Sequence, residues 1–299
     1  MTAPSMSIRD AIEHFLEQLA QQQALGVATQ QAYRRDLLAF AQWGHAQQMT
    51  ALDDVDVAAV RAFAAAEHRR GLSPRSIARR LSALRRFFKH ARRQGWSDRD
   101  PTQGVQAPKI QRKLPETLDM DQVLALLDLP TDTPLAIRDR AMLEMFYASG
   151  LRVSELAQLC WRDLDQAQGL VRVLGKGQKQ RLVPVGRHAL KALAQWQAHQ
   201  APQAERVFTN LAGRPLTTRA LQKRVAHWSQ RQGLDQRVHP HQLRHSFASH
   251  ILQSSGDLRA VQELLGHANL STTQIYTHLD YQHLAKVYDQ AHPRAKKST

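Results

Sequence analysis

Apolar residues recur every three to four positions through the first hundred residues, which is the spacing of one face of an α-helix. Four such segments begin at residue types that commonly cap helices. The expected starts are Ser7, Thr29, Asp56 and the Ser73-Pro74 pair, and Gly71 is expected to end the third segment. The first part of the chain is therefore predicted to consist of four helices.

The fourth helical segment combines an apolar stripe with a high positive charge. Residues 69–93 contain ten Lys or Arg and no acidic residue. Acidic residues usually alternate with basic ones on a solvated helix face, where they form i,i+4 pairs. The pattern therefore favours contact with a phosphate backbone, although a solvated face remains the alternative. The candidate DNA-binding residues are Arg75, Arg79, Arg80, Arg86 and Lys89.

The helical pattern stops between residues 98 and 116. Three prolines and Gly104 interrupt it, while Lys109, Arg112 and Lys113 keep the stretch basic. This composition is typical of an extended linker. We therefore expect a DNA-binding domain over 1–97, a linker over 98–116 and a second domain over 117–299.

The second domain is predicted to be mainly helical. Two β-type runs, Leu170–Leu174 and Arg181–Val185, flank a Gly-Lys-Gly turn that contains Lys176, so we expect a hairpin there. The expected helices are Asp119–Leu129, Pro134–Ser149, Arg187–His199, Thr217–Gln232, His241–Gln253, Asp257–Leu265 and Thr272–Ala285. The predicted fold class is thus mainly α with a small antiparallel sheet.

Composition narrows the class of partner. The chain of 299 residues has 41 Lys and Arg against 26 Asp and Glu, a net charge of +15. Residues 1–116 contribute +7 and the remainder +8, so both domains are suited to nucleic acid or an anionic surface. Without a long apolar run or a signal-like start we expect a cytoplasmic protein with no membrane insertion. The single Cys160 excludes an intramolecular disulfide.

Four short motifs in the second domain point to a specific chemistry. They are Ser-Gly-Leu-Arg-Val-Ser-Glu-Leu at 149–156, Gly-Lys-Gly at 175–177, His-Gln-Leu-Arg at 241–244, and Leu-Gly-His at 265–267 followed by Tyr276. Together, in this order, they resemble the tyrosine recombinase (phage integrase) family over the whole chain. The resemblance implies an N-terminal helical core-binding domain of SAM-like fold. It also implies a mainly helical catalytic domain that exchanges DNA strands at specific sites.

The resemblance assigns Tyr276 as the nucleophile, which would form a 3′-phosphotyrosyl bond to DNA, and places Arg152 and Arg244 on the scissile phosphate. Two guanidinium groups suit this task because each binds phosphate oxygens through paired hydrogen bonds and keeps its proton. The covalent bond conserves the phosphodiester energy, so the resemblance implies no ATP, metal or other cofactor.

The remaining implied roles concern protons. Lys176 would protonate the leaving 5′ oxygen, His241 would accept the proton of the tyrosine hydroxyl, and His267 would hydrogen-bond the phosphate. Neutral imidazole suits the role of acceptor because it titrates near physiological pH.

Each assignment has an alternative that the residues alone leave open. Arg152 could simply pair with Glu155, three residues later. Lys179 and Arg181 lie in the same predicted hairpin as Lys176 and could take its place. Tyr281 and Tyr288 are the competitors of Tyr276 as nucleophile.

A zinc site is the main metal alternative. His241 and His245 are four residues apart, the spacing of a zinc-binding helix. Position 242 is Gln242, however, where a zinc protease has its general base Glu, so we expect no metal.

The end of the chain narrows the resemblance. Residues 281–289 and 291–295 resemble bacterial chromosome-dimer resolvases within the family. The implied partners are duplex DNA with a dif-type site, a XerD-like recombinase in a heterotetramer and an FtsK-like translocase as regulator. The C-terminal segment is expected to contact a partner, with packing on its own domain as the alternative. Other open functions are those of a XerD-like or mobile-element integrase, a type IB topoisomerase-like enzyme and a catalytically silent DNA-binding regulator.

Overall fold

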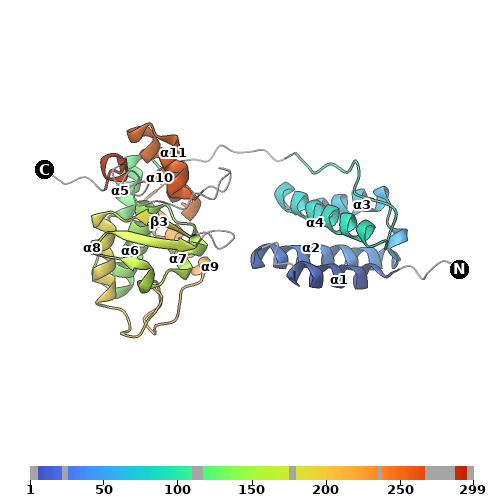
Figure 1. Cartoon of the computed structure of the whole chain (residues 1–299), viewed down its shortest axis with the longest axis horizontal. Helices are drawn as coiled ribbons and strands as arrows, with labels where there is room; N and C mark the ends of the chain where they lie inside the picture. The colour runs from blue at the N-terminus through green and yellow to red at the C-terminus, as the bar shows by residue number, and fades with distance from the viewer. Residues whose placement is uncertain are drawn as a thin grey trace. The chain divides into compact units, whose positions relative to one another are not determined.

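The structure, a computed structural model, describes residues 6–21, 26–109, 117–174, 180–234, 238–266 and 287–294. It divides into two compact units, Met1–Lys113 and Leu114–Thr299 (Figure 1). Each unit has its own hydrophobic core. The described residues are mostly helical and include one three-stranded antiparallel sheet. The predicted fold class is confirmed.

The N-terminal unit is built from four helices and a short 3-10 turn. They are α1 (Ile8–Gln21), α2 (Val27–Ala46), η1 (Leu52–Asp54), α3 (Val57–Arg69) and α4 (Pro74–Arg93). Helix α4 contacts each of the other three, and its apolar stripe lies in their common core. The unit therefore depends on α4 for its packing as well as for its charge.

The predicted helix starts agree with the structure at three of four places. Asp56 and Ser73 accept hydrogen bonds from the backbone N–H groups of Ala59 and Ser76 as N-caps. Ser7 likewise accepts from the N–H of Asp10, at 3.1 Å. The expectation for Thr29 is wrong, because α2 begins at Val27 after an extended Gly26. Thr29 belongs to a residue type that commonly caps helices, but α2 already begins two residues before it.

Part of the predicted linker packs on the N-terminal unit. Val105 is buried in the core of this unit, and its carbonyl accepts a hydrogen bond from Arg85 of α4. Asp100 accepts hydrogen bonds from the backbone and hydroxyl of Thr102. Residues 100–105 are thus folded rather than extended, whereas 110–116 lie outside the described residues. The limits of the predicted domains stay a prediction.

The C-terminal unit is arranged around α6. Its helices are α5 (Met120–Leu127), α6 (Pro134–Ser149), α7 (Val153–Gln158), α8 (Arg187–Gln197), α9 (Thr218–Arg231), α10 (Pro240–Ser255) and α11 (Leu258–Leu265), with the 3-10 turn η2 (Trp161–Asp163). Helix α6 is buried on nearly all sides and contacts α5, α8, α10 and β3. Helix α7 and the turn η2 had no counterpart in the sequence prediction.

The sheet consists of β1 (Leu164–Asp165), β2 (Leu170–Leu174) and β3 (Gln180–Pro184), in that order. Leu174 lies opposite Gln180, so the antiparallel pairing of the predicted hairpin is confirmed. Its turn, with Lys176, lies outside the described residues, as does the predicted helix Thr272–Ala285. Among the described helices, none is long and apolar enough to cross a membrane.

Candidate active site

The first catalytic motif is presented by the end of α6. Gly150 terminates this helix in the left-handed region, with φ of 56°. A Cβ atom at this position would lie 2.5 Å from Cδ1 of Phe247, so both the backbone conformation and the available space require glycine. The chain turns here and places Arg152 at the N-cap of α7.

Glu155, in the first turn of α7, joins two arginines. Its Oε1 accepts hydrogen bonds from Nη1 of Arg152 at 2.8 Å and from Nη1 of Arg181 at 2.9 Å. Its Oε2 accepts from the backbone N–H of Arg152 at 2.8 Å and from Nη2 of Arg181 at 2.9 Å. The pairing of Arg152 with Glu155, which the sequence left open as the alternative to a catalytic role, is therefore present, and Arg181 shares the same carboxylate.

The C-terminal end of α11 gathers three arginines. The carbonyl of Leu264 accepts from Arg181 at 3.3 Å, and that of Leu265 accepts from Arg244 at 2.6 Å. The carbonyl of Gly266 lies 3.5 Å from Nη2 of Arg152. The last carbonyls of a helix have no partner within the helix and carry partial negative charge, which favours guanidinium groups. We call Arg152, Arg181, Arg244 and Glu155 the arginine cluster.

The three arginines of the cluster differ in exposure. The side chain of Arg152 is 37% exposed, whereas that of Arg181 is 6% exposed and Arg244 is buried. Burial, together with the charge of Arg152, lowers the pKa of the Arg244 guanidinium to about 10, which keeps it protonated at neutral pH. Arg152 is thus the member of the cluster that is most accessible to a ligand.

The charge of the cluster suits an anion. Burial by itself would raise the pKa of Glu155, but the hydrogen bonds and positive charge of Arg181, followed by the hydrogen bonds from Arg152, lower it below its usual value. One carboxylate among three guanidinium groups leaves two net positive charges. Such an arrangement can bind a phosphodiester and stabilise additional negative charge on it.

The structure describes three of the six predicted catalytic residues. It brings Arg152 and Arg244 to the same helix end, although they are 92 positions apart in the sequence. His241 lies exposed in the first turn of α10, one turn before Arg244. Lys176, His267 and Tyr276 lie outside the described residues.

Two alternatives for the catalytic residues lose support. Nη1 and Nη2 of Arg181 donate to the two oxygens of the Glu155 carboxylate. These donors are therefore already engaged, which disfavours Arg181 as a replacement for Lys176 as the proton donor. Tyr288 is buried and its hydroxyl accepts a hydrogen bond from the backbone N–H of Gly186, at 3.0 Å. Burial raises the pKa of Tyr288 above its usual value, which disfavours a nucleophilic role.

The histidines of α10 do not form a recognisable metal site. His241 and His245 are both exposed on this helix. Within the part of the chain that the structure describes, no three His, Cys, Asp or Glu residues are grouped so that they could hold a metal ion.

Sequence reasoning missed the position of Arg181. It occupies an inward-facing position of β3, where exposed and buried residues alternate over the first four positions. Its neighbours in this alternation are Leu182, which is exposed, and Val183, which is buried. A charged residue at an inward position of a short strand is the signal that could have identified it as the partner of a buried acid.

The predicted DNA-binding residues lie on α4 but face different ways. Arg75, Arg79 and Lys89 are exposed and Arg86 is half-buried. Arg80 faces the core, where it pairs with the buried carboxylates of Glu67 and Asp36. Arg79 also pairs with Asp36, at 2.6 Å, while its side chain remains 41% exposed.

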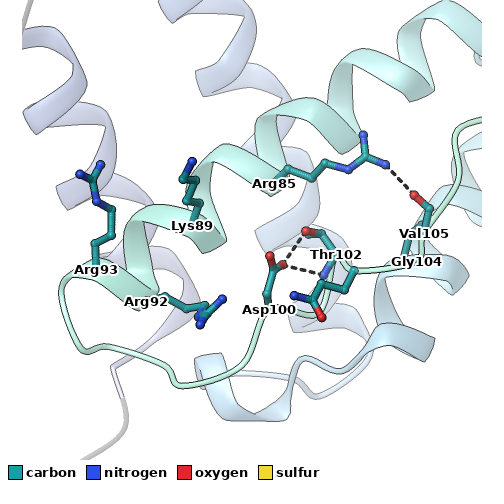
Figure 2. A pocket seen from close by; sticks show the side chains of 9 residues that line it. Arg85, Lys89, Arg92, Arg93, Asp100, Thr102, Gly104 and Val105 are labelled. Carbon is teal, nitrogen blue, oxygen red and sulfur yellow. Dashed lines mark hydrogen bonds between the residues drawn. The ribbon is translucent and has the colours of Figure 1, made fainter.

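Further basic side chains lie on α4 beside the predicted DNA-binding residues. Figure 2 shows Arg85, Lys89, Arg92 and Arg93 along α4, beside a hollow bordered by the segment from Asp100 to Val105. Arg92 and Arg93 are exposed and were not among the predicted residues. The C-terminal half of α4 therefore presents several exposed basic residues beside the folded segment from Asp100 to Val105.

Comparison with known protein families agrees with both units. Residues 12–95 match the phage integrase N-terminal SAM-like domain, and residues 116–283 match the phage integrase family. The chain belongs to the phage integrase family. It is thus a tyrosine recombinase, an enzyme that transfers DNA strands in site-specific recombination.

Within this family, the chain is similar to proteins named tyrosine recombinase XerC. It is 55% identical to that of Xanthomonas campestris pv. campestris (strain B100), over 96% of this chain and 89% of the relative. It is 48% identical to that of Serratia marcescens, over 99% of both. A solved structure of XerH site-specific recombinase bound to difH substrate, in a pre-cleavage complex, is 27% identical with a TM-score of 0.66, over 92% of this chain and 82% of that one.

Proposed function

We propose that this chain acts with a XerD-like recombinase in a heterotetramer and recombines DNA at a dif-type site. In this proposal an FtsK-like translocase regulates the exchange, which resolves chromosome dimers at cell division in the cytoplasm. The observation that carries the proposal is the identity of 48–55% to proteins named XerC over nearly the whole chain.

The proposed reaction is a pair of transesterifications. The hydroxyl oxygen of Tyr276 attacks the scissile phosphorus, and His241 accepts the hydroxyl proton. The bond from phosphorus to the 5′ oxygen breaks, and that oxygen takes a proton from Lys176. The 5′ hydroxyl of another strand then attacks the phosphorus of the 3′-phosphotyrosyl bond and gives its proton to the neutral Lys176. The bond from phosphorus to the tyrosine oxygen breaks, and that oxygen takes back its proton from His241. Each step replaces one phosphoester bond by another, so no ATP is consumed.

The arginine cluster supports the proposed roles of Arg152 and Arg244. Both donate to carbonyls at the end of α11, directly before His267 in the sequence. Paired hydrogen bonds from guanidinium groups would stabilise the added negative charge of the pentacoordinate phosphorus. In this proposal His267 contributes a further hydrogen bond to the same phosphate.

The N-terminal unit is proposed to hold the DNA through α4. The exposed positions of Arg75, Arg79 and Lys89 and the half-buried position of Arg86 support phosphate contacts by these residues. The buried ion pairs of Arg80 favour a role in stabilising α4 over the DNA contact expected for it.

Covalent trapping tests the proposed nucleophile. The protein is incubated with a nicked dif-like duplex from which the cleaved fragment diffuses away, with a chelator in place of magnesium. Denaturing electrophoresis is expected to show a protein–DNA adduct for the wild type and none for Tyr276→Phe, because the phenylalanine lacks the attacking oxygen. A XerD-like partner is added in a parallel reaction.

Tyr281→Phe is the matched control, because Tyr281 is a nearby tyrosine in the sequence, and it is expected to retain the adduct. An adduct that persists in Tyr276→Phe would contradict the assignment of the nucleophile. Absence of any adduct with the wild type and its partner would contradict the proposed activity at this site.

A further inference from the structure

We propose that Arg181 is a positioning residue for DNA cleavage: it fixes the carboxylate of Glu155, and through this carboxylate the guanidinium of Arg152. The inference rests on the proposed function, since it takes Arg152 to act on the scissile phosphate. Arg181 itself is not proposed to touch DNA.

The geometry at Glu155 carries the inference. A carboxylate offers about four acceptor positions, and those of Glu155 receive two hydrogen bonds from Arg181 and two from Arg152. The paired bonds from Arg181 fix the plane of the carboxylate, because a guanidinium fork matches it in one orientation. The direction in which Glu155 holds Arg152 is therefore set by Arg181.

Arg181 also fixes the helix end that the other arginines contact. Its Nε donates to the carbonyl of Leu264, at 3.3 Å. Gly266 packs directly on its side chain, and a Cβ atom there would lie 2.9 Å from Cδ of Arg181. Gly266 has φ of 64°, so the backbone conformation and the contact with Arg181 both require glycine in the Leu-Gly-His motif.

Burial distinguishes Arg181 from the phosphate-binding candidates. Its side chain is 6% exposed, against 37% for Arg152, and its donors already bind Glu155 and Leu264. Without Arg181, the buried Glu155 would keep Arg152 as its cationic partner and hold it more strongly. Arg152 would then be misoriented and less available to an incoming phosphate.

The expected consequence is a loss of cleavage without a loss of DNA binding. Single-turnover cleavage of the nicked duplex by Arg181→Met is expected to be about 10- to 100-fold slower than by the wild type, a typical cost of a misplaced catalytic group. Arg181→Lys is expected to be intermediate, because a lysine supplies one charge without the fork. The DNA dissociation constant is expected to change less than threefold in both variants, an order-of-magnitude limit for a side chain that does not contact DNA.

A substrate with a methylphosphonate at the scissile position separates positioning from a structural defect. The methyl group removes one charged phosphate oxygen, so the reaction depends less on the arginines. If Arg181 acts through Arg152 on this charge, the defect of Arg181→Met is expected to be several-fold smaller on the methylphosphonate than on the phosphodiester. A defect of equal size on both substrates would overturn the proposal.

Arg138→Met is the matched control for the loss of a buried, ion-paired arginine. Arg138 is also a buried arginine bound to a carboxylate by two donors, but its partner is Asp139 of α6, outside the arginine cluster. Any defect of this variant is expected to be the same on both substrates. Cleavage at the wild-type rate by folded Arg181→Lys and Arg181→Met would overturn the proposal.

The outcomes also separate this inference from the proposed function. If the wild type forms no adduct with either substrate, the proposed function fails, and this inference fails with it. If the wild type forms the adduct through Tyr276 while the Arg181 variants show no selective defect, the inference about Arg181 alone fails.

Discussion

Arg80 and Arg86 lie on the same helix, α4, but their guanidinium groups have different surroundings. Arg80 pairs with Glu67 and Asp36, whose side chains are 1% and 2% exposed. Burial raises the pKa of Asp36 despite the opposing charges of Arg79 and Arg80, so its ionised form depends on these partners. Arg86 lies farther along α4 in the basic surface proposed to contact DNA.

Alanine substitutions at these two positions are expected to separate folding from DNA binding. Arg80→Ala should lower the free energy of unfolding by about 3 kcal/mol, because it removes a partner from buried carboxylates. Arg86→Ala should change it by less than about 0.5 kcal/mol. Urea denaturation followed by circular dichroism measures both effects, and wild-type stability of Arg80→Ala would contradict the first.

The affinities of the wild type, Arg80→Ala and Arg86→Ala for duplex DNA are measured at several salt concentrations. If Arg86 contacts a phosphate, Arg86→Ala should reduce the slope of log K against log [salt] by about 1. An unchanged slope with a lost preference for the specific sequence would instead indicate that Arg86 reads bases.

At the scale of elements, glycines end the helices that present the candidate site. Gly150 ends α6 and Gly256 ends α10, both in the left-handed region. Around Gly256 there is open space, whereas Gly150 lies against the ring of Phe247. Both helix ends therefore require a left-handed backbone conformation, but only at Gly150 does a neighbouring side chain also leave no room for a Cβ atom.

Alanine substitution at these glycines is expected to have unequal effects. Gly256→Ala should cost about 1 kcal/mol of unfolding free energy, the penalty of the left-handed conformation for a residue with a Cβ. Gly150→Ala should cost about 3 kcal/mol, because the contact with Phe247 adds an overpacking cost. Denaturant unfolding of both variants measures the difference, and equal costs would show that Phe247 moves aside without penalty.

At the scale of the whole molecule, the chain has two cores, and residues 287–294 pack on the second one. Tyr288 and His292 are fully buried and stacked, with ring centroids 4.7 Å apart. His292 accepts from the backbone N–H of Arg294, and its other ring nitrogen lies 3.3 Å from the carbonyl of Tyr147. Arg294 pairs with the buried Glu144 of α6. Residues 287–294 thus pack on the C-terminal unit, whereas residues 267–286, which include most of the segment expected to contact a partner, lie outside the described residues.

The burial of His292 links this docking to pH. Burial lowers the pKa of His292 to about 3, so below about pH 6.5 the unfolded chain binds a proton that the folded one does not. The free energy of unfolding should therefore fall with decreasing pH, by up to about 1.4 kcal/mol per pH unit from this group. His292→Phe should remove this part of the slope between pH 6.5 and 4.5. Urea denaturation across this range measures it, and identical slopes for both proteins would contradict the assignment.

The sequence by itself determined most of the elements and the family. Helices such as α1, α3 and α4 are encoded by apolar spacing and by local capping residues, and the antiparallel pairing of β2 with β3 follows from two short β-type runs. Both signals act within a few residues, so they can be read without knowledge of the fold. Arg80 could have been placed correctly as well, because it lies three residues after Ile77 and four before Leu84, on the apolar face.

Only the tertiary structure decided which charges meet. Glu155 and Arg181 are 26 positions apart, and Arg181 and Leu264 are 83 apart, yet they contact one another at the arginine cluster. The packing of residues 100–105 on α4 and the start of α2 at Val27 were also invisible in the sequence. The physical reason is common to all of these: burial and pairing depend on how distant elements pack together, which local periodicity does not encode.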